Sequence, residues 1–127
     1  MKIQNLEELD TPCLILDKPL LEKNCFKARK KCLELSTILR PHMKTPKSIE
    51  IAKIALDNQI GPITVSTLNE AEYFAGAGFK DILYAVCIIP KKLKRLNFIQ
   101  QKYSCIIRIV VDSTYVAQEI LKYSNLH

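Results

Sequence analysis

The feature that most constrains the fold of this 127-residue chain is a regular alternation of apolar runs and amphipathic segments. Four apolar runs begin near residues 38, 62, 82 and 105, so successive runs start about 20 to 24 residues apart. Between them, apolar residues recur at helical spacing. Continuous Ile, Val and Leu runs that alternate with helices indicate parallel strands covered on both faces. Right-handed crossovers of this kind build either a doubly wound sheet or a (β/α)8 barrel.

Turn and cap signals mark the boundaries of the individual elements. Residues 13–17 (CLILD) predict a short strand, and Asp17 can cap a helix that has Pro19 in its first turn. The apolar residues of this helix predict one buried stripe, formed by Leu21, Cys25, Ala28, Cys32 and Leu35. The later elements are predicted as a strand at 36–44, a helix at about 46–57, a strand at 62–66, a helix begun by the capping box TLNE at 67–70, a strand at 81–89, a basic helix opened by Pro90, a strand at 105–112 and a final helix capped by Ser113.

Composition excludes several classes of protein. With 48% hydrophobic and 25% charged residues, the chain can form one globular domain with its own core. No apolar run approaches the roughly 18 residues that a membrane span needs, and the acidic start of the chain does not resemble a signal peptide. Five scattered cysteines without a CxxC pair indicate reduced thiols, so we expect a cytoplasmic protein.

The net charge of +6 raises the question of a nucleic-acid partner. Much of this charge lies in two clusters, Lys23, Lys27, Arg29, Lys30 and Lys31, and Lys91, Lys92, Lys94 and Arg95. Leu93, Leu96 and Ile99 fall at helical spacing, which leaves the second cluster on the opposite, solvated side of a helix. No aromatic residues interleave with the cations to stack on bases. The pattern therefore favours solvated helix faces over RNA binding.

The chemically richest junction is RPHMKTPKS, residues 40–48. Ligands of parallel α/β folds bind where strands end and helices begin. Strand alternation places Arg40, His42 and Lys44 on one face, and burying three such groups costs free energy unless they are paired or the amine is neutral. A neutral amine is what Schiff-base chemistry requires. The residues alone leave two hypotheses open: Lys44 is a nucleophilic or anion-binding lysine, or it is a solvated residue at the end of a strand.

Five segments, in order and at natural spacing, carry a resemblance to a known family. They are LDTPCLILD (9–17), RPHMKTPKS (40–48), GPITVSTLNEAE (61–72), AGFKDILYA (77–85) and VDS (111–113). They are similar to segments of the fold-type III pyridoxal-phosphate (PLP) enzymes of the D-threonine aldolase and D-serine dehydratase group, which is related to the N-terminal domain of alanine racemase. The resemblance implies the first half of a (β/α)8 barrel of the TIM type, with about four βα units preceded by a short strand and a helix.

In that group, the lysine that follows RPH-x forms the internal aldimine with PLP, and it corresponds to Lys44. The resemblance also implies that Lys44 is a base at the substrate α-carbon, and that His42, Arg40 and Thr67 are candidates for binding the cofactor. His42 and Arg40 can instead pair with acidic neighbours, and Thr67 can be a helix cap alone. Pro46 stands where the group usually has a second histidine, so an imidazole is missing beside the lysine.

The resemblance further implies that residues 1–127 are a partial alanine racemase N-terminal-like domain. A (β/α)8 barrel typically has about 250 residues. The later barrel strands, the C-terminal β domain and the divalent-metal ligands of the group have no counterpart here, and no metal ligand is predicted in this chain. We expect a truncated or inactive fragment that self-associates through its exposed barrel edges.

The predicted function is that of a PLP-dependent lyase, which cleaves or dehydrates small D-amino acids through Lys44. Two alternatives stay open: a PLP-binding protein without catalysis, and a basic α/β module that binds RNA or anionic surfaces. Schiff-base absorbance would indicate a PLP-binding protein, whereas salt-dependent binding to arbitrary RNA would indicate the basic module.

Overall fold

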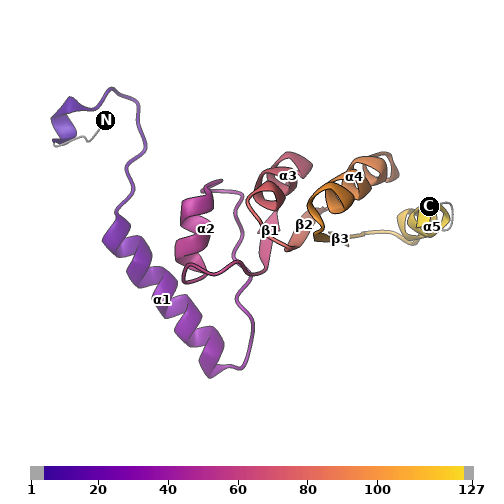
Figure 1. Ribbon diagram of the computed structural model, residues 1–127, viewed down its shortest axis with the longest axis horizontal. Coiled ribbons are helices and arrows are strands. Elements are labelled where there is room, and N and C mark those ends of the chain that lie inside the picture. The colour runs from indigo at the N-terminus through magenta and orange to yellow at the C-terminus, as the bar shows by residue number, and fades with distance from the viewer. Residues whose placement is uncertain (1–4, 125–127) are drawn as a thin grey trace.

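The computed structural model describes residues 5–124, which form a row of helices around a small parallel sheet (Figure 1). The elements are η1 (Leu6–Glu8), α1 (Lys18–Glu34), α2 (Ile49–Ala55), β1 (Ile63–Val65), α3 (Leu68–Gly76), β2 (Asp81–Cys87), η2 (Pro90–Lys92), α4 (Leu93–Tyr103), β3 (Ile106–Val110) and α5 (Thr114–Ser124). No helix in this part of the chain has both the length and the apolar character needed to cross a lipid bilayer.

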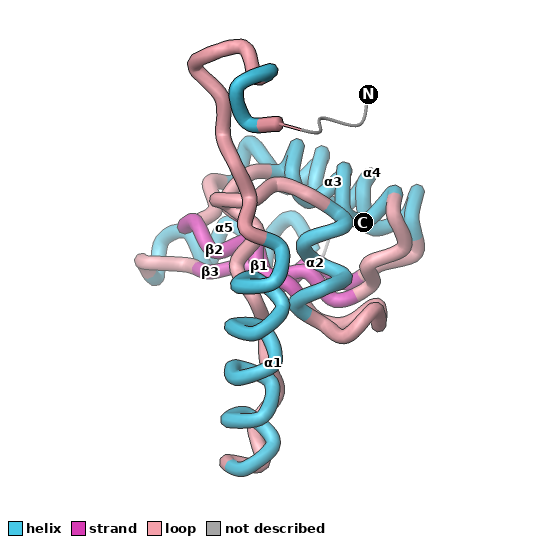
Figure 2. Tube along the Cα trace, turned by 90° about the vertical axis from the view of Figure 1, so that its left-hand side faces the viewer, coloured by secondary structure: helices cyan, strands magenta, loops and turns pink. Residues whose placement is uncertain are grey.

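The sheet is parallel throughout, in the order β1-β2-β3, and helices connect its strands. Helices α3 and α4 lie along one face of it (Figures 1 and 2). The core on this face contains Ile63, Val65, Ile82, Tyr84 and Ile107 from the strands and Phe74 and Phe79 from α3 and the segment after it. The alternate residues of the strands, Thr64, Leu83 and Arg108, point to the other face because side chains alternate along a strand. The predicted α/β class with a parallel sheet is confirmed.

The predicted first strand, 36–44, is much shorter than expected. It forms a single parallel bridge between His42 and Thr64. Met43 N donates to Thr64 O at 2.8 Å, and Thr64 N donates to Pro41 O at 2.9 Å. Pro41 has no N–H to extend this ladder, and a turn begins at Met43. Residues 13–17 also lack the predicted strand, because no ladder forms with them in the described part of the chain.

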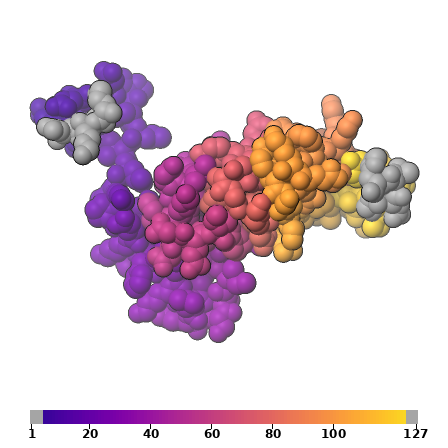
Figure 3. Space-filling view, in the orientation of Figure 1, coloured from indigo at the N-terminus to yellow at the C-terminus, as the bar shows by residue number. Residues whose placement is uncertain are grey.

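Helix α1 does not bury the predicted apolar stripe. None of its residues is buried, and it packs mainly on α2. Arg29 makes the chief polar contacts: its Nη1 donates to Ile54 O at 2.8 Å, and its Nη2 lies 3.2 Å from Asp57 Oδ1. The guanidinium thereby satisfies a carbonyl at the C-terminal end of α2. Residues 5–17, which precede α1, stand clear of the body of the molecule (Figure 3).

The predicted helix caps are confirmed. Asp17 Oδ1 accepts from Leu20 N at 2.9 Å at the start of α1, and Ser113 Oγ accepts from Val116 N at 3.2 Å at the start of α5. Thr67 caps α3, as described below.

Two helices begin later than predicted. Helix α2 starts at Ile49 with Ser48 as its cap, not near Pro46, because Lys47 adopts a left-handed backbone with φ of +43° that a right-handed helix cannot include. After Pro90, a 3₁₀ turn precedes α4.

Candidate active site

The candidate site lies at the carboxyl edge of the sheet. The turn after His42, the β1–α3 junction at Ser66 and Thr67, and the chain after β2 and β3 all belong to this edge. Parallel α/β folds bind ligands there because the loops that leave the strands gather at one end. Lys44 and Thr67 are both on this edge, as predicted for a site that combines them.

Lys44 lies in a tight turn that its neighbours close. Lys47 N donates to Met43 O at 3.0 Å across the turn, and the Met43 side chain is buried in the core. Lys44 N donates to His42 Nδ1 at 3.1 Å. This bond occupies one ring nitrogen of His42 and leaves Nε2 available to another partner. Lys44 itself is exposed, so its amine can meet a ligand from solution.

Thr67 caps α3, and Glu70 ties this cap to the Lys44 turn. Thr67 Oγ1 accepts from Glu70 N at 3.1 Å. Glu70 Oε2 accepts from Ser66 N at 2.8 Å, one residue earlier than a standard capping box, and Glu70 Oε1 lies 3.4 Å from Lys47 Nζ. Burial raises the pKa of Glu70, but the Ser66 amide and the Lys47 ammonium lower it by more, so this pKa lies below its usual range.

Arg40 lies at the opposite edge of the sheet from Lys44. Its Nη1 and Nη2 donate to Asp81 Oδ1 and Oδ2 at 3.0 and 2.9 Å, and Asp81 is the first residue of β2. Arg108 Nε also donates to Asp81 Oδ1, at 3.0 Å. Of the two predicted roles for Arg40, the structure therefore shows the pairing with an acidic neighbour.

A basic groove adjoins Thr67 between the starts of α3 and α4. It has a volume of about 460 Å³ and is lined by Thr67, Leu68, Asn69, Ile89, Lys91, Lys92 and Arg95. Arg95 Nη2 donates to Asn69 Oδ1 at 2.6 Å and also pairs with Glu72, while Lys92 Nζ donates to the Tyr84 hydroxyl at 2.7 Å. These cations thus have partners within the chain and join α4 to its neighbours.

The interactions that sequence reasoning missed are the long-range ones. The capping box singled out Glu70 as a cap, but nothing in it pointed to Lys47 as the partner of the carboxylate. Asp81 was read only as the start of a strand. A polar residue at the beginning of an otherwise apolar strand was the available signal that it has a charged partner.

No family model matches the chain, but solved structures define its class. An alanine racemase-like protein from Idiomarina loihiensis matches with a TM-score of 0.87 and 39% identity, over 94% of this chain and 32% of that protein. D-threo-3-hydroxyaspartate dehydratase from Delftia sp. HT23 matches with a TM-score of 0.88 and 35% identity, over 94% and 31%. The chain has an α/β fold with a parallel sheet that matches part of the alanine racemase-like, TIM-barrel-type domains of fold-type III PLP enzymes.

Sequence comparison gives the particular relatives. The chain is 36% identical to the Delftia dehydratase over 117 residues, which are 92% of this chain and 30% of the relative. It is 40% identical to D-serine dehydratase from Dictyostelium discoideum over 95 residues, which are 71% of this chain and 24% of the relative. The chain is a homologue of these dehydratases, and the predicted resemblance is confirmed. It spans less than a third of the length of these two relatives.

Another solved structure that matches, of a D-threo-3-hydroxyaspartate dehydratase C353A mutant, is a metal-free form, which implies that relatives of this family bind a metal. Within residues 5–124 of the present chain, no group of three or more His, Cys, Asp and Glu side chains could hold a metal ion.

Proposed function

We propose that this chain provides the cofactor-binding lysine of a PLP-dependent lyase that dehydrates or cleaves small D-amino acids. The observation that carries the proposal is the place of Lys44, an exposed residue in a closed turn at the carboxyl edge of the sheet. The chain that holds this turn matches an alanine racemase-like protein and a D-threo-3-hydroxyaspartate dehydratase with TM-scores of 0.87 and 0.88. The two dehydratases support dehydration as the type of reaction. A 3-hydroxy-D-aspartate aldolase from Paracoccus denitrificans, 36% identical over 70% of this chain and 24% of the relative, supports aldol cleavage.

The residues at this edge fit PLP. The Lys44 amine can bind the aldehyde of the cofactor, and the Thr67 hydroxyl and His42 Nε2 offer polar contacts beside it. When bound, PLP supplies an electron sink for a carbanion at the substrate α-carbon. In the proposed mechanism, the substrate amine would take the place of Lys44 on the cofactor, and the released Lys44 Nζ would accept the α-proton from the face of the substrate on which the turn presents it. Arg40, which was also predicted as a cofactor-binding residue, pairs with Asp81 at the other end of the sheet. In the proposed mechanism it would therefore not touch the cofactor and would act only by stabilising the sheet.

Pro46 bears on the chemistry of this lysine. It lies in the Lys44 turn, where relatives of the group usually have a histidine. We propose that no imidazole at position 46 exchanges protons with Lys44 in this chain. The imidazole closest to Lys44 in sequence is that of His42, two residues before it.

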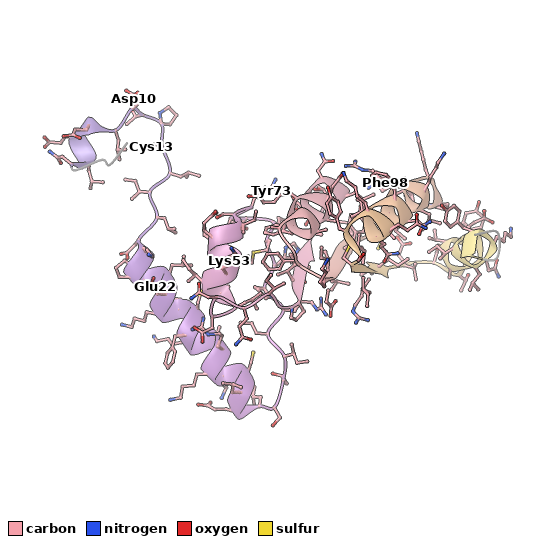
Figure 4. The ribbon with its side chains drawn as sticks, viewed as in Figure 1. Asp10, Cys13, Glu22, Lys53, Tyr73 and Phe98 are labelled. Carbon is pink, nitrogen blue, oxygen red and sulfur yellow. The ribbon has the colours of Figure 1, made fainter. Side chains whose placement is uncertain are left out.

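Reductive trapping tests the proposal. The protein is incubated with PLP, reduced with borohydride and digested, and the modified peptides are mapped by mass. Selective modification of Lys44 among the 15 lysines is the expected result. Lys44→Arg should remove this labelled peptide, because arginine keeps the charge but forms no stable imine. Lys53→Arg is the matched control on α2 (Figure 4) and should leave the labelling unchanged.

Two results would contradict or narrow the proposal. Labelling spread evenly over the lysines would contradict a formed site at Lys44. Selective labelling without turnover of D-serine or D-threo-3-hydroxyaspartate would favour the alternative of a PLP-binding protein without catalysis.

A further inference from the structure

The buried polar side chains of the described part of the chain lie next to the Lys44 turn. They belong to Thr64 and Glu70, whereas the other buried residues there are hydrophobic. At the start of the turn, the Thr64 carbonyl oxygen accepts a hydrogen bond from Met43 N. Glu70 pairs with Lys47 at the end of the turn. Both ends of the turn are thus attached to β1 and to the helix that follows it.

The Glu70 carboxylate is expensive to bury unless it is paired. Its side chain is only 8% exposed, and burying an unpaired carboxylate at such a site is strongly unfavourable. Two donors of different kinds compensate: the rigid Ser66 amide at 2.8 Å and the flexible Lys47 ammonium at 3.4 Å. The hydrogen bond from Ser66 N fixes the Glu70 carboxylate at the β1–α3 junction. The ion pair with Glu70 therefore holds Lys47 at a position set by the end of β1.

The turn needs such an attachment because its own backbone is strained. Lys47 adopts φ of +43°, a left-handed conformation that is unfavourable for a residue other than glycine. Inside the turn, the closing contacts are one backbone hydrogen bond, from Lys47 N to Met43 O, and the bond from Lys44 N to His42 Nδ1. Lys47 is 62% exposed, so the surrounding protein does not hold its side chain in place by packing.

We propose that Glu70 is a positioning residue: through Lys47 it holds the turn 43–47 against the β1–α3 junction and so fixes the direction of the Lys44 amine. The inference rests on the proposed function for its chemical consequence, which is selective reaction of Lys44. A groove of about 510 Å³ lined by Lys47, Thr67, Asn69, Glu70 and Tyr73 runs beside this contact, and Tyr73 is labelled on α3 in Figure 4.

The chain offers a matched control on the same helix. Glu72 is two residues from Glu70 and also pairs with cations, Arg95 at 3.2 Å and Lys102 at 3.5 Å. Both carboxylates have a lowered pKa. Glu72 faces α4, however, and within residues 5–124 no hydrogen bond or ion pair joins its side chain to the Lys44 turn. Glu70→Gln and Glu72→Gln therefore remove the same charge from α3, but only the first acts on the turn.

Amide hydrogen exchange in the full chain is the direct test, because it needs no cofactor. In Glu70→Gln we expect the amides of Met43, Lys44 and Lys47 to exchange about tenfold faster, the effect of losing one charged hydrogen bond. Glu72→Gln should leave them unchanged. Lys47→Met removes the exposed partner of Glu70, so it should speed the exchange of the same amides without a folding defect. Lys47→Arg keeps the positive charge and should leave the exchange as slow as in the wild-type protein.

PLP trapping then links the contact to chemistry. The fraction of label on Lys44 should fall about tenfold in Glu70→Gln and Lys47→Met relative to Glu72→Gln. Unchanged turn exchange in both Glu70→Gln and Lys47→Met would overturn the positioning role. If the turn amides respond but the wild-type protein shows no selective label on Lys44, the proposed function fails while the positioning role stands.

Discussion

Asp81 is the most heavily bonded carboxylate on the sheet face that α3 and α4 leave open. Arg40 donates two hydrogen bonds to the Asp81 carboxylate, and Arg108 donates a third. These partners lie on the strand-like segment before β1 and on β3, so one side chain joins segments on both sides of β2. Hydrogen bonding from Arg40 lowers the pKa of Asp81, burial opposes this, and Arg108 lowers it further, so the net pKa lies below its usual range.

The sign of this pKa shift predicts how stability depends on pH. A carboxyl whose pKa is lower in the folded state stabilises the fold above its unfolded pKa of about 3.9. We therefore expect the free energy of unfolding to fall as the pH drops below about 4 and approaches the native pKa. Asp81→Asn should remove this part of the acid sensitivity and should cost about 1–2 kcal/mol at neutral pH, because the two guanidinium groups lose the negative charge and one of the two acceptor oxygens.

Urea unfolding followed by circular dichroism, repeated between acid and neutral pH, measures this effect. Glu34→Gln is the control: Glu34 pairs with Lys31 at 3.5 Å on the exposed surface of α1, and its loss should change stability by less than about 0.5 kcal/mol. An Asp81→Asn protein with wild-type stability at neutral pH would show that the two arginines find equivalent partners elsewhere.

At the scale of the elements, local signals and long-range contacts differ in how well the sequence predicts them. Asp17, Thr67 and Ser113 could be recognised as caps because each bonds an amide three residues ahead. Lys47 and Glu70 are far apart in sequence, and Arg40 and Asp81 are 41 residues apart, so no local pattern reports either pair. The helical periodicity of α1 indicates an apolar stripe, but it does not show which other element, if any, packs against that stripe, and no residue of α1 is buried.

The same limit explains the first strand. The apolar run before Arg40 has the composition of a strand, and a strand forms a ladder only where a neighbour supplies the complementary hydrogen bonds. In the described chain that neighbour is β1, which is three residues long and pairs only at His42. The sequence predicted that Lys44 lies at the carboxyl edge of the sheet. It did not predict the turn that holds Lys44 there, because that turn depends on the pairing with β1.

The connection between α3 and β2 permits a paired prediction about glycines. Gly78 has φ of +97°, and a Cβ there would meet Ile60 Cδ1 at 3.2 Å. Gly78→Ala should therefore lower the free energy of unfolding by about 1–2 kcal/mol. Gly76 ends α3 without a positive φ, and its added Cβ would make an ordinary contact at 3.6 Å with Tyr103. Gly76→Ala should be neutral or stabilise by up to about 1 kcal/mol through helix propensity.

Thermal unfolding of the two variants checks this pair in one experiment, since both add a single methyl group within three residues of each other. Equal melting temperatures for Gly76→Ala and Gly78→Ala would contradict the assignment of a required left-handed residue at Gly78.

At the scale of the whole molecule, the chain matches part of the fold of much longer relatives, and one face of its sheet is largely uncovered at β3. The match to the Delftia dehydratase covers 94% of this chain but 31% of that protein. Helices α3 and α4 lie along the buried face of the sheet (Figure 2). On the other face, Thr64 of β1 is buried, but Ile106, Arg108 and Val110 of β3 are exposed to solvent. A parallel sheet exposed on one face is unusual, because such sheets are normally covered on both sides.

This open face leads us to predict concentration-dependent self-association. Ile106 is 57% exposed on β3, which is an edge strand of the three-stranded sheet, and Val110 is also exposed on the same face. Unpaired edges next to exposed aliphatic side chains favour strand pairing and apolar burial between copies. Light scattering across a dilution series should show a mass above that of one chain. Ile106→Lys should lower this mass by placing a charge on the face, whereas Leu35→Lys, at the C-terminal end of α1 and away from the sheet, should not. A single-chain mass at every concentration would contradict association, and equal effects of the two substitutions would place it on another surface.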